Sequence, residues 1–268
     1  MVATILITGC SRGLGLALAA EFSKAGHLVF TTARGDPTPA LEELIKSSSS
    51  TVKYIKLDAA SRSSVQESEK QVASLLDSKD INVLINNAGV INWMTTRIHA
   101  MDDLDSVLNP NVTSAHIVTS TFLPRLERGA QEKVINMLVA NIFYARNQIL
   151  TMELKSSSGG SIEQSPVYST MAIPAYKVSK AALNMLTVQY AQSYAEEGFT
   201  FLAVNPGWLR TDLGGASADL DVETGAKAVV ELIESNGKES NGKFLNIRVA
   251  GWENNEGINQ YDGNVLPW

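Results

Sequence analysis

Tyr176 and Lys180 stand four residues apart in the stretch Tyr-Lys-Val-Ser-Lys. On a helix this spacing places both side chains on one face. A free tyrosine has a pKa of about 10 and is a poor acid or base at neutral pH, but a neighbouring ammonium stabilises the phenolate and lowers that pKa. The pair therefore predicts a proton-transfer group. A surface pair at helical spacing is the competing interpretation, because the motif is common by chance.

A glycine-rich turn follows the first apolar run of the chain and precedes a helical pattern. Gly9 permits a tight turn, Gly13 lets the backbone approach a pyrophosphate, and Gly15 lets the helix pack close to a sheet. The start of a helix also offers free N–H groups and partial positive charge to phosphates. We therefore predict a dinucleotide site that includes Gly9, Ser11, Arg12, Gly13, Leu14 and Gly15. A turn without a ligand is the competing interpretation.

Two arginines favour NADP(H) over NAD(H) as the cofactor. The second apolar run ends at Ala33 and Arg34, where an acidic residue would bind a free ribose 2′-hydroxyl. A guanidinium suits a 2′-phosphate instead, and Arg12 can join Arg34 there. Asp58, after the third run, is expected to accept from the adenine amino group or to belong to a helix N-cap region. The competing interpretation of Arg34 is a solvated loop charge.

Short apolar runs alternate with longer helical patterns along the chain. The predicted strands are Ala3–Thr8, Leu28–Thr32, Val52–Leu57, Val83–Asn86, Lys133–Met137, Thr200–Val204 and Lys243–Ile247. The predicted helices are Leu14–Ala25, Ser61–Leu76, Met101–Leu126, Ala175–Glu197 and Glu223–Glu234. This alternation predicts an α/β fold, a doubly wound Rossmann sheet of seven parallel strands with helices on both faces. We expect one NAD(P)-binding domain over residues 1–268.

Composition excludes several classes of function. The 268 residues carry a net charge of −6, which gives no electrostatic support for binding nucleic acid. A single cysteine excludes an internal disulfide or a cysteine metal cluster, and three scattered histidines show no metal-ligand spacing. The chain starts without a basic signal-peptide region, and no apolar run is long enough to span a membrane. We expect a cytoplasmic protein without a membrane partner.

Taken together, the motifs resemble the short-chain dehydrogenase/reductase family. The resemblance covers nearly the whole chain and rests on Thr8–Gly15, Asn86–Gly89, Asn111, Tyr176–Lys180 and Asn205–Gly207. It implies that Asn111 holds a proton-relay water and that Thr211 contacts the nicotinamide carboxamide. The further cofactor contacts that it implies are Asn87, Ala88, Gly89, Tyr176, Lys180, Pro206 and Gly207.

The last residues sharpen this resemblance. Tyr261–Trp268 is similar to the end of the C-factor/sniffer-like branch and of fungal norsolorinic-acid ketoreductase-like enzymes, and Ala181–Met185 also fits. The likeness implies carbonyl reduction, and its fungal side implies secondary metabolism, but it leaves the substrate open. In such enzymes the Met101–Leu126 and Ala175–Glu197 helices form dimer faces, which implies a homodimer or homotetramer.

One part of the family pattern is interrupted. A serine should follow the fifth strand within two residues, but an atypical stretch of 18 residues, Leu138–Lys155, intervenes. Removing this stretch restores the pattern with Ser157 as the catalytic serine, and Ser156 and Ser158 are alternatives. Two interpretations stand: a genuine insertion at about 138–155, and an artefact of the gene model such as a retained short intron.

The implied reaction reduces a carbonyl, a hydrophobic or aromatic ketone, to an alcohol with NADPH. Tyr176 would donate the proton, assisted by Lys180 and the water held by Asn111, while Ser157 would polarise the carbonyl. The alternative is an NADP-binding regulator with little catalysis, because the insertion displaces Ser157. A third interpretation is an isomerase or dehydratase on the same scaffold.

Overall fold

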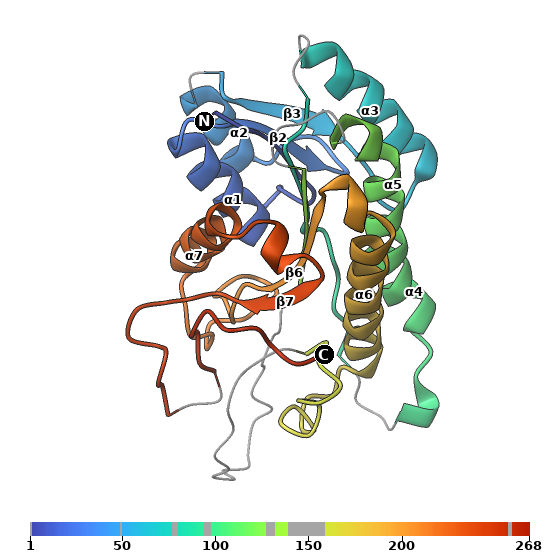
Figure 1. The fold of residues 1–268 in the computed structure, drawn as a ribbon, viewed down its shortest axis with the longest axis vertical. Coiled ribbons are helices and arrows are strands. Elements are labelled where there is room, and N and C mark those ends of the chain that lie inside the picture. The colour runs from blue at the N-terminus through green and yellow to red at the C-terminus, as the bar shows by residue number, and fades with distance from the viewer. Residues whose placement is uncertain are drawn as a thin grey trace.

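One parallel sheet organises the protein (Figure 1). The computed structural model describes residues 2–48, 50–76, 80–93, 98–126, 132–138, 159–256 and 259–268. Their sheet has the order β3-β2-β1-β4-β5-β6-β7 with every pairing parallel. Its strands are β1 (Thr4–Ile7), β2 (Leu28–Ala33), β3 (Val52–Lys56), β4 (Val83–Asn86), β5 (Lys133–Met137), β6 (Thr200–Asn205) and β7 (Lys243–Asn246). All seven predicted strands are confirmed, each to within one residue at either end.

Helices cover both faces of this sheet (Figure 1). Along β1, Ile5 and Ile7 pack into the core that α1 and α7 share, whereas Leu6 packs into the core of α3, α5 and α6. Successive side chains of a strand point to opposite faces, so a strand covered on both sides must be apolar at nearly every position. The helices are α1 (Gly13–Lys24), α3 (Arg62–Leu75), α5 (Ser114–Leu126), α6 (Pro174–Ser193) and α7 (Val222–Ser235).

The predicted helix Met101–Leu126 begins three residues later than predicted, at Leu104, and contains a π-helical turn in its first half. The chain forms α4 (Leu104–Leu108), then a π-helical turn, η2 (Asn109–Thr113), and only then α5. Pro110 is the physical reason, because its ring removes one N–H donor and crowds the preceding turn. The widened turn holds Asn111, and π-turns within helices are frequent at functional sites.

A further helix, α2 (Pro39–Ser47), was not predicted. Its sequence signal is local: the Thr38 hydroxyl caps the helix by accepting from the Leu41 backbone N–H, and Pro39 occupies the first turn. The described residues also include short 3₁₀ turns at η1 (Ile98–Ala100), η3 (Ala195–Glu197) and η4 (Lys238–Ser240). The predicted end of α6 at Glu197 therefore falls in η3.

The sheet reverses its winding between β1 and β4. The chain runs outward from β1 through β2 to β3, then crosses back to β4 and continues to β7 on the other side. In doubly wound sheets a crevice opens at such a point, beyond the carboxyl ends of the strands. Among the described residues, no helix combines the length and the apolar character that crossing a bilayer requires.

Candidate active site

The turn between β1 and α1 lies at this crevice and depends on its glycines. Gly9 and Gly13 have φ values of +73° and +57°, which favour glycine. A Cβ atom at Gly9 would also lie 3.0 Å from the Cα of Ala88, at the end of β4. The backbone is therefore exposed along the turn, where a ligand can approach closely.

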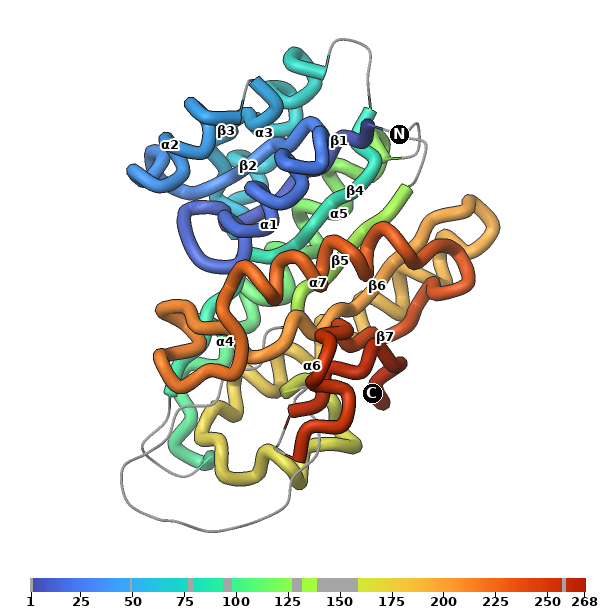
Figure 2. The backbone as a smooth tube through the Cα atoms, turned by 90° about the vertical axis from the view of Figure 1, so that its left-hand side faces the viewer, coloured from blue at the N-terminus to red at the C-terminus, as the bar shows by residue number. Residues whose placement is uncertain are grey.

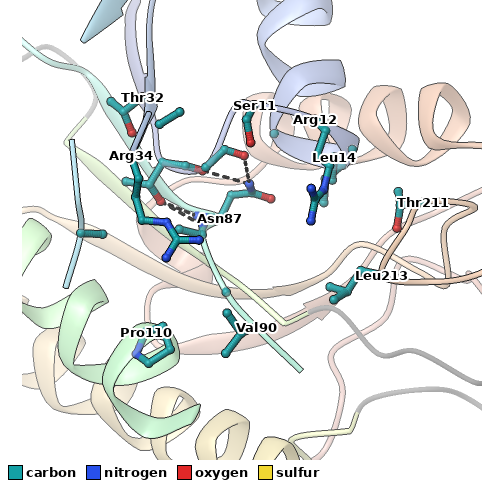
Figure 3. Close-up of a pocket in the computed structure, with 18 of the residues that line it drawn as sticks. Ser11, Arg12, Leu14, Thr32, Arg34, Asn87, Val90, Pro110, Thr211 and Leu213 are labelled. Atoms are coloured by element: carbon teal, nitrogen blue, oxygen red, sulfur yellow. Dashed lines mark hydrogen bonds between the residues drawn. The ribbon is translucent and has the colours of Figure 1, made fainter. Parts of the chain in front are cut away.

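Asn87 holds the turn in place. Its side-chain amide donates to the carbonyl oxygens of Thr8 and Gly9, at 2.9 and 3.1 Å (Figure 3). In return, the Thr8 hydroxyl accepts from the backbone N–H groups of Asn87 and Ala88, each at 3.0 Å. Gly15 completes the packing, because a Cβ there would lie 2.3 Å from the Gly9 carbonyl oxygen.

The first turn of α1 has the features of an anion-binding helix N-terminus. Arg12 occupies the N-cap position in extended conformation, without a side-chain hydrogen bond to the helix, and the first turn holds no acidic residue. The N–H groups at this end therefore keep their partial positive charge. A phosphate is the natural ligand for such a helix start.

A cavity of about 480 Å³ opens beside the turn, at the carboxyl ends of the strands (Figure 3). This volume is in the range of small-molecule and cofactor sites. Twelve of the predicted cofactor residues line it: Gly9, Ser11, Arg12, Gly13, Leu14, Gly15, Arg34, Asp58, Asn87, Ala88, Gly89 and Thr211. The sequence motifs missed other lining residues: Val90, Pro110, Ser114, Leu209, Arg210, Leu213 and Val222.

The residues expected at the adenosine side come from three loops. Arg34 is exposed at the end of β2 and reaches the cavity, as does Arg12 from the turn (Figure 3). Arg12 forms an exposed ion pair with Asp212, at 3.2 Å between Nε and Oδ2. The Asp58 carboxylate accepts from the Ala60 N–H. It does not cap α3, because the Ser61 hydroxyl does so.

Pro206 and Gly207 do not line the cavity. They form the turn that leaves β6, both are buried, and Gly207 has a φ of +82°. The same loop reaches the cavity farther along the chain, where Thr211 lines it. Thr211 is therefore in a position to make the predicted cofactor contact, whereas Pro206 and Gly207 form the turn that directs the loop.

Tyr176 and Lys180 lie side by side on the first half of α6, as their spacing predicts. The Lys180 Nζ is 5.4 Å from the centre of the Tyr176 ring and donates to the Met137 carbonyl oxygen at 3.1 Å. Both side chains are buried, and neither lines the cavity. Tyr176 packs instead among Tyr168, Met171 and Ile173.

Burial controls the acidity of this pair. It lowers the pKa of Lys180 to about 8, because the ammonium is removed from water. It also raises the pKa of the Tyr176 phenol, whose hydroxyl finds no hydrogen-bond partner in the described part of the chain. The pKa of the Tyr176 phenol is therefore raised by burial in this structure, whereas the spacing to lysine predicts that it is lowered. The phenol holds its proton at neutral pH.

Asn111 joins the pair to the cavity wall. Its side-chain oxygen accepts from the Val90 N–H at 2.7 Å, and its amide donates to the Val90 carbonyl and to the Ser179 hydroxyl, each at 2.9 Å. A Cβ at Gly89 would lie 3.1 Å from the Asn111 oxygen and 3.7 Å from the Lys180 Nζ. Three separate motifs thus meet at Gly89, which lines the cavity.

The predicted catalytic serine, Ser157, lies outside the described residues, as do Ser156, Ser158 and 139–155. The chain is described again from Gly159, where an added Cβ would lie 3.7 Å from the Tyr176 Cε1. At Gly160 an added Cβ would come within 2.9 Å of the Lys180 Cβ, and the Gly160 carbonyl accepts from the Asn184 amide.

A phosphate-binding type of turn at the switch point of a parallel sheet defines the Rossmann class of α/β proteins. Within that class, the family model of the short chain dehydrogenases matches residues 3–151. The chain belongs to this family and is an oxidoreductase.

Individual relatives agree with this assignment. The short-chain dehydrogenase anuI of Penicillium roqueforti is 29% identical over 90% of this chain and 92% of its own. The NADPH-bound carbonyl reductase from chicken fatty liver superposes with a TM-score of 0.80 at 26% identity, covering 100% of this chain and 99% of that one. For the carbonyl reductase Sniffer of D. melanogaster the values are 0.78 and 28%, with both chains fully covered. The predicted resemblance is confirmed.

Replacing Gly15 by alanine tests the packing of the turn. The added Cβ would clash with the Gly9 carbonyl and displace the turn. A displacement of about 1 Å in such a site can reduce the reaction rate about 10²-fold. We expect calorimetric titration to show at least about tenfold weaker affinity for NADPH, the expected cofactor. Gly35→Ala is the control, because a Cβ there meets no atom within 4 Å. Equal affinity in the two variants would contradict the close packing.

Replacing Lys180 by methionine tests the burial of the ammonium. Methionine fills similar space without a charge, so the free energy of unfolding at pH 7 should rise by about 1–2 kcal/mol. The difference should shrink as the pH rises from about 8 towards 10.5, because folded wild-type protein then loses the proton while the unfolded chain keeps it. Urea unfolding at several pH values measures the stability difference at pH 7 and its change with pH. The exposed Lys70→Met variant is the control. A destabilised Lys180→Met protein would refute this account.

Proposed function

We propose that the protein reduces a carbonyl compound to an alcohol with NADPH. The observation that carries the proposal is that Asn111 and Lys180 meet directly behind Gly89, which lines the cavity of the glycine turn, while Lys180 also lies over the Tyr176 ring. A proton donor therefore lies next to a site built for a dinucleotide. The carbonyl reductases named above support this reading, one of them in its NADPH-bound form.

The residues around the cavity fit NADPH. The glycines leave room for a pyrophosphate, and the uncapped start of α1 offers N–H groups to it. Arg34 stands where a ribose 2′-phosphate would need a partner, with Arg12 across the cavity (Figure 3). Asp58 and Thr211 would hold the adenine and the nicotinamide carboxamide. When bound, the cofactor supplies the hydride.

Each side chain of the Tyr176 group has one task in the proposal. Tyr176 donates a proton to the carbonyl oxygen, and its raised pKa keeps it protonated for reduction. The Lys180 ammonium stabilises the phenolate that remains. Asn111 orients Ser179 and the Val90 backbone, and would hold the water that returns a proton. Ser157 would polarise the carbonyl.

The described ends of the interrupted segment support the role of Ser157. Met137 accepts from Lys180 on one side, and Gly159 and Gly160 abut Tyr176 and Lys180 on the other. Ser157 is two residues before Gly159 in the sequence, which is the basis for proposing it as the serine of this group. We propose a single domain over residues 1–268 with an atypical insertion at about 138–155.

The neighbours of Tyr176 favour an apolar substrate. Met171 and Ile173 pack against the phenol together with Tyr168, and Ile91 contacts the same cluster. Such walls suit a hydrophobic or aromatic ketone, because a polar substrate would lose its hydration without compensating bonds.

One observation favours a second candidate, an NADP-binding regulator with little catalysis. Tyr176 is only 2% exposed, and it does not line the cavity. A substrate must therefore displace part of the Tyr168–Ile173 segment to reach the phenol. Tight NADPH binding without turnover of any ketone or quinone would select the regulator.

Substitution of Tyr176 by phenylalanine tests the proton donor. Loss of a general acid costs about 10²–10⁴ in rate, so NADPH oxidation with a panel of ketones and quinones should fall by at least about 10². Affinity for NADPH should stay within about twofold, because the phenyl ring preserves the packing. Near-wild-type turnover in this variant would remove Tyr176 from the mechanism.

Substitution of Arg34 by leucine tests the cofactor preference. A charge-assisted hydrogen bond is worth about 1.5–3 kcal/mol, so the preference for NADPH over NADH should fall by about 10- to 100-fold. The ratio of kcat/KM for the two cofactors measures this. Arg62→Leu is the matched control, because Arg62 is exposed but does not line the cavity. An unchanged ratio in the Arg34 variant would show that the 2′-phosphate is bound elsewhere.

A further inference from the structure

The loop that follows β6 closes on itself at the edge of the cavity, which Leu209 and Arg210 already line. Leu209 and Leu220 form a parallel bridge, the Arg210 N–H donates to the Leu220 carbonyl at 2.8 Å, and the Leu220 N–H donates to the Trp208 carbonyl at 3.1 Å. We call these bonded residues, 208–210 and 220, the neck of the loop. Residues 211–219 form a closed tip beyond it.

The tip supplies one wall of the cavity. Thr211, Asp212 and Leu213 line it, and a Cβ at Gly13 would lie 3.5 Å from the Thr211 Cγ2. Thr211 and Leu213 lie across the cavity from Arg34 (Figure 3). Thr211 and Leu213 therefore face the half of the cavity away from Arg34, whereas Asp212 pairs with Arg12 in an exposed salt bridge, which contributes little energy.

A single buried hydroxyl ties together both ends of the loop. The Tyr261 Oη accepts from the Trp208 backbone N–H at 3.0 Å and donates to the Asp219 Oδ2 at 2.7 Å. The Asn259 amide donates to the same carboxylate oxygen. The Tyr261 ring is fully buried, and both burial and the Asp219 charge raise the pKa of the phenol, so it remains a donor.

The neighbouring tail residue holds the turn that leads into the neck. The Asn246 amide donates to the Asp262 carboxylate at 2.9 Å, and the Asn246 oxygen accepts from the Asn205 amide at 3.0 Å. Asn205 in turn accepts from the Gly207 N–H at 3.3 Å. Residues 259–268, which we call the tail, run beside β7 with antiparallel bridges (Figure 2).

We propose that Tyr261 and Asp219 are positioning residues for the cofactor. Their hydrogen bond fixes the position of the neck and thereby holds Thr211, Asp212 and Leu213 against the cavity. The inference rests on the proposed function in taking the cavity for the NADPH site. Neither Tyr261 nor Asp219 lines the cavity. They act through the loop. A displacement of the loop by about 1 Å would be enough to misplace a side chain that contacts the cofactor.

The geometry separates the two halves of the ligand. Arg34 and Asp58 come from β2 and β3 and do not depend on the neck, whereas Thr211 does. Loss of the Tyr261 hydroxyl should therefore weaken binding of NADPH but not of 2′,5′-ADP, which lacks the nicotinamide half. A substitution that merely destabilised the fold would weaken both.

The test compares Tyr261→Phe with wild type by calorimetric titration of both ligands. We expect the NADPH dissociation constant to rise about tenfold and that of 2′,5′-ADP to stay within about twofold. Asp219→Ala should behave like Tyr261→Phe, and Asp219→Asn should restore most of the affinity, because its amide oxygen can still accept from the phenol. Tyr190→Phe is the matched control, because that hydroxyl bonds His116 at a different place.

Hydrogen–deuterium exchange provides a readout that needs no ligand. Backbone amides of residues 211–219 should exchange faster in Tyr261→Phe and Asp219→Ala, while those of α3 keep their wild-type rates. Unchanged exchange in the tip, or equal loss of affinity for both ligands, would overturn the proposal. If wild-type protein failed to bind NADPH, the proposed function would fall, and the exchange rates would still decide the role of Tyr261.

Discussion

The side-chain amide of Asn87 donates to the carbonyls of Thr8 and Gly9 and so joins the end of β4 to the turn after β1. These two strands are the pair between which the sheet reverses its winding. Glycine leaves the turn without side chains that could fix its shape, so the bonds from the next strand do it. The cavity, the free start of α1 and the position of Arg12 all depend on where this turn lies.

The predicted proton-transfer pair works against the stability of the fold. Lys180 and Tyr176 are buried beside each other, and desolvation moves both pKa values away from their ordinary range. Among the described residues, the Lys180 ammonium donates to one carbonyl, that of Met137. Groups held in this way are typical of functional sites, where activity is retained at a cost in folding energy. The apolar cluster around Tyr176 extends the same principle, because it excludes water from the phenol that we propose as the proton donor.

How far the sequence predicted the fold depended on whether each signal was local. The seven strands were found because strands buried on both faces are apolar at almost every position. Pro110 interrupts the predicted helix Met101–Leu126, and the widened turn there depends on how the helix packs. The short helix α2 did carry a local signal, because Leu41, Leu44 and Ile45 form an apolar stripe and Thr38 and Pro39 mark its start. The direction of the Tyr176 pKa shift could not be predicted from the sequence. The spacing of residues indicates which charge lies near the phenol, but it does not indicate how far the phenol is buried from water.

By itself the sequence determined the strands, the glycine turn and the shared face of Tyr176 and Lys180, because each follows from neighbours along the chain. Tertiary structure alone decided which residues form the cavity, and that Pro206 and Gly207 stand outside it. It also decided that Tyr261 bonds residues 53 and 42 positions away. Such contacts arise where separate elements pack together, and no local pattern encodes the distance between them.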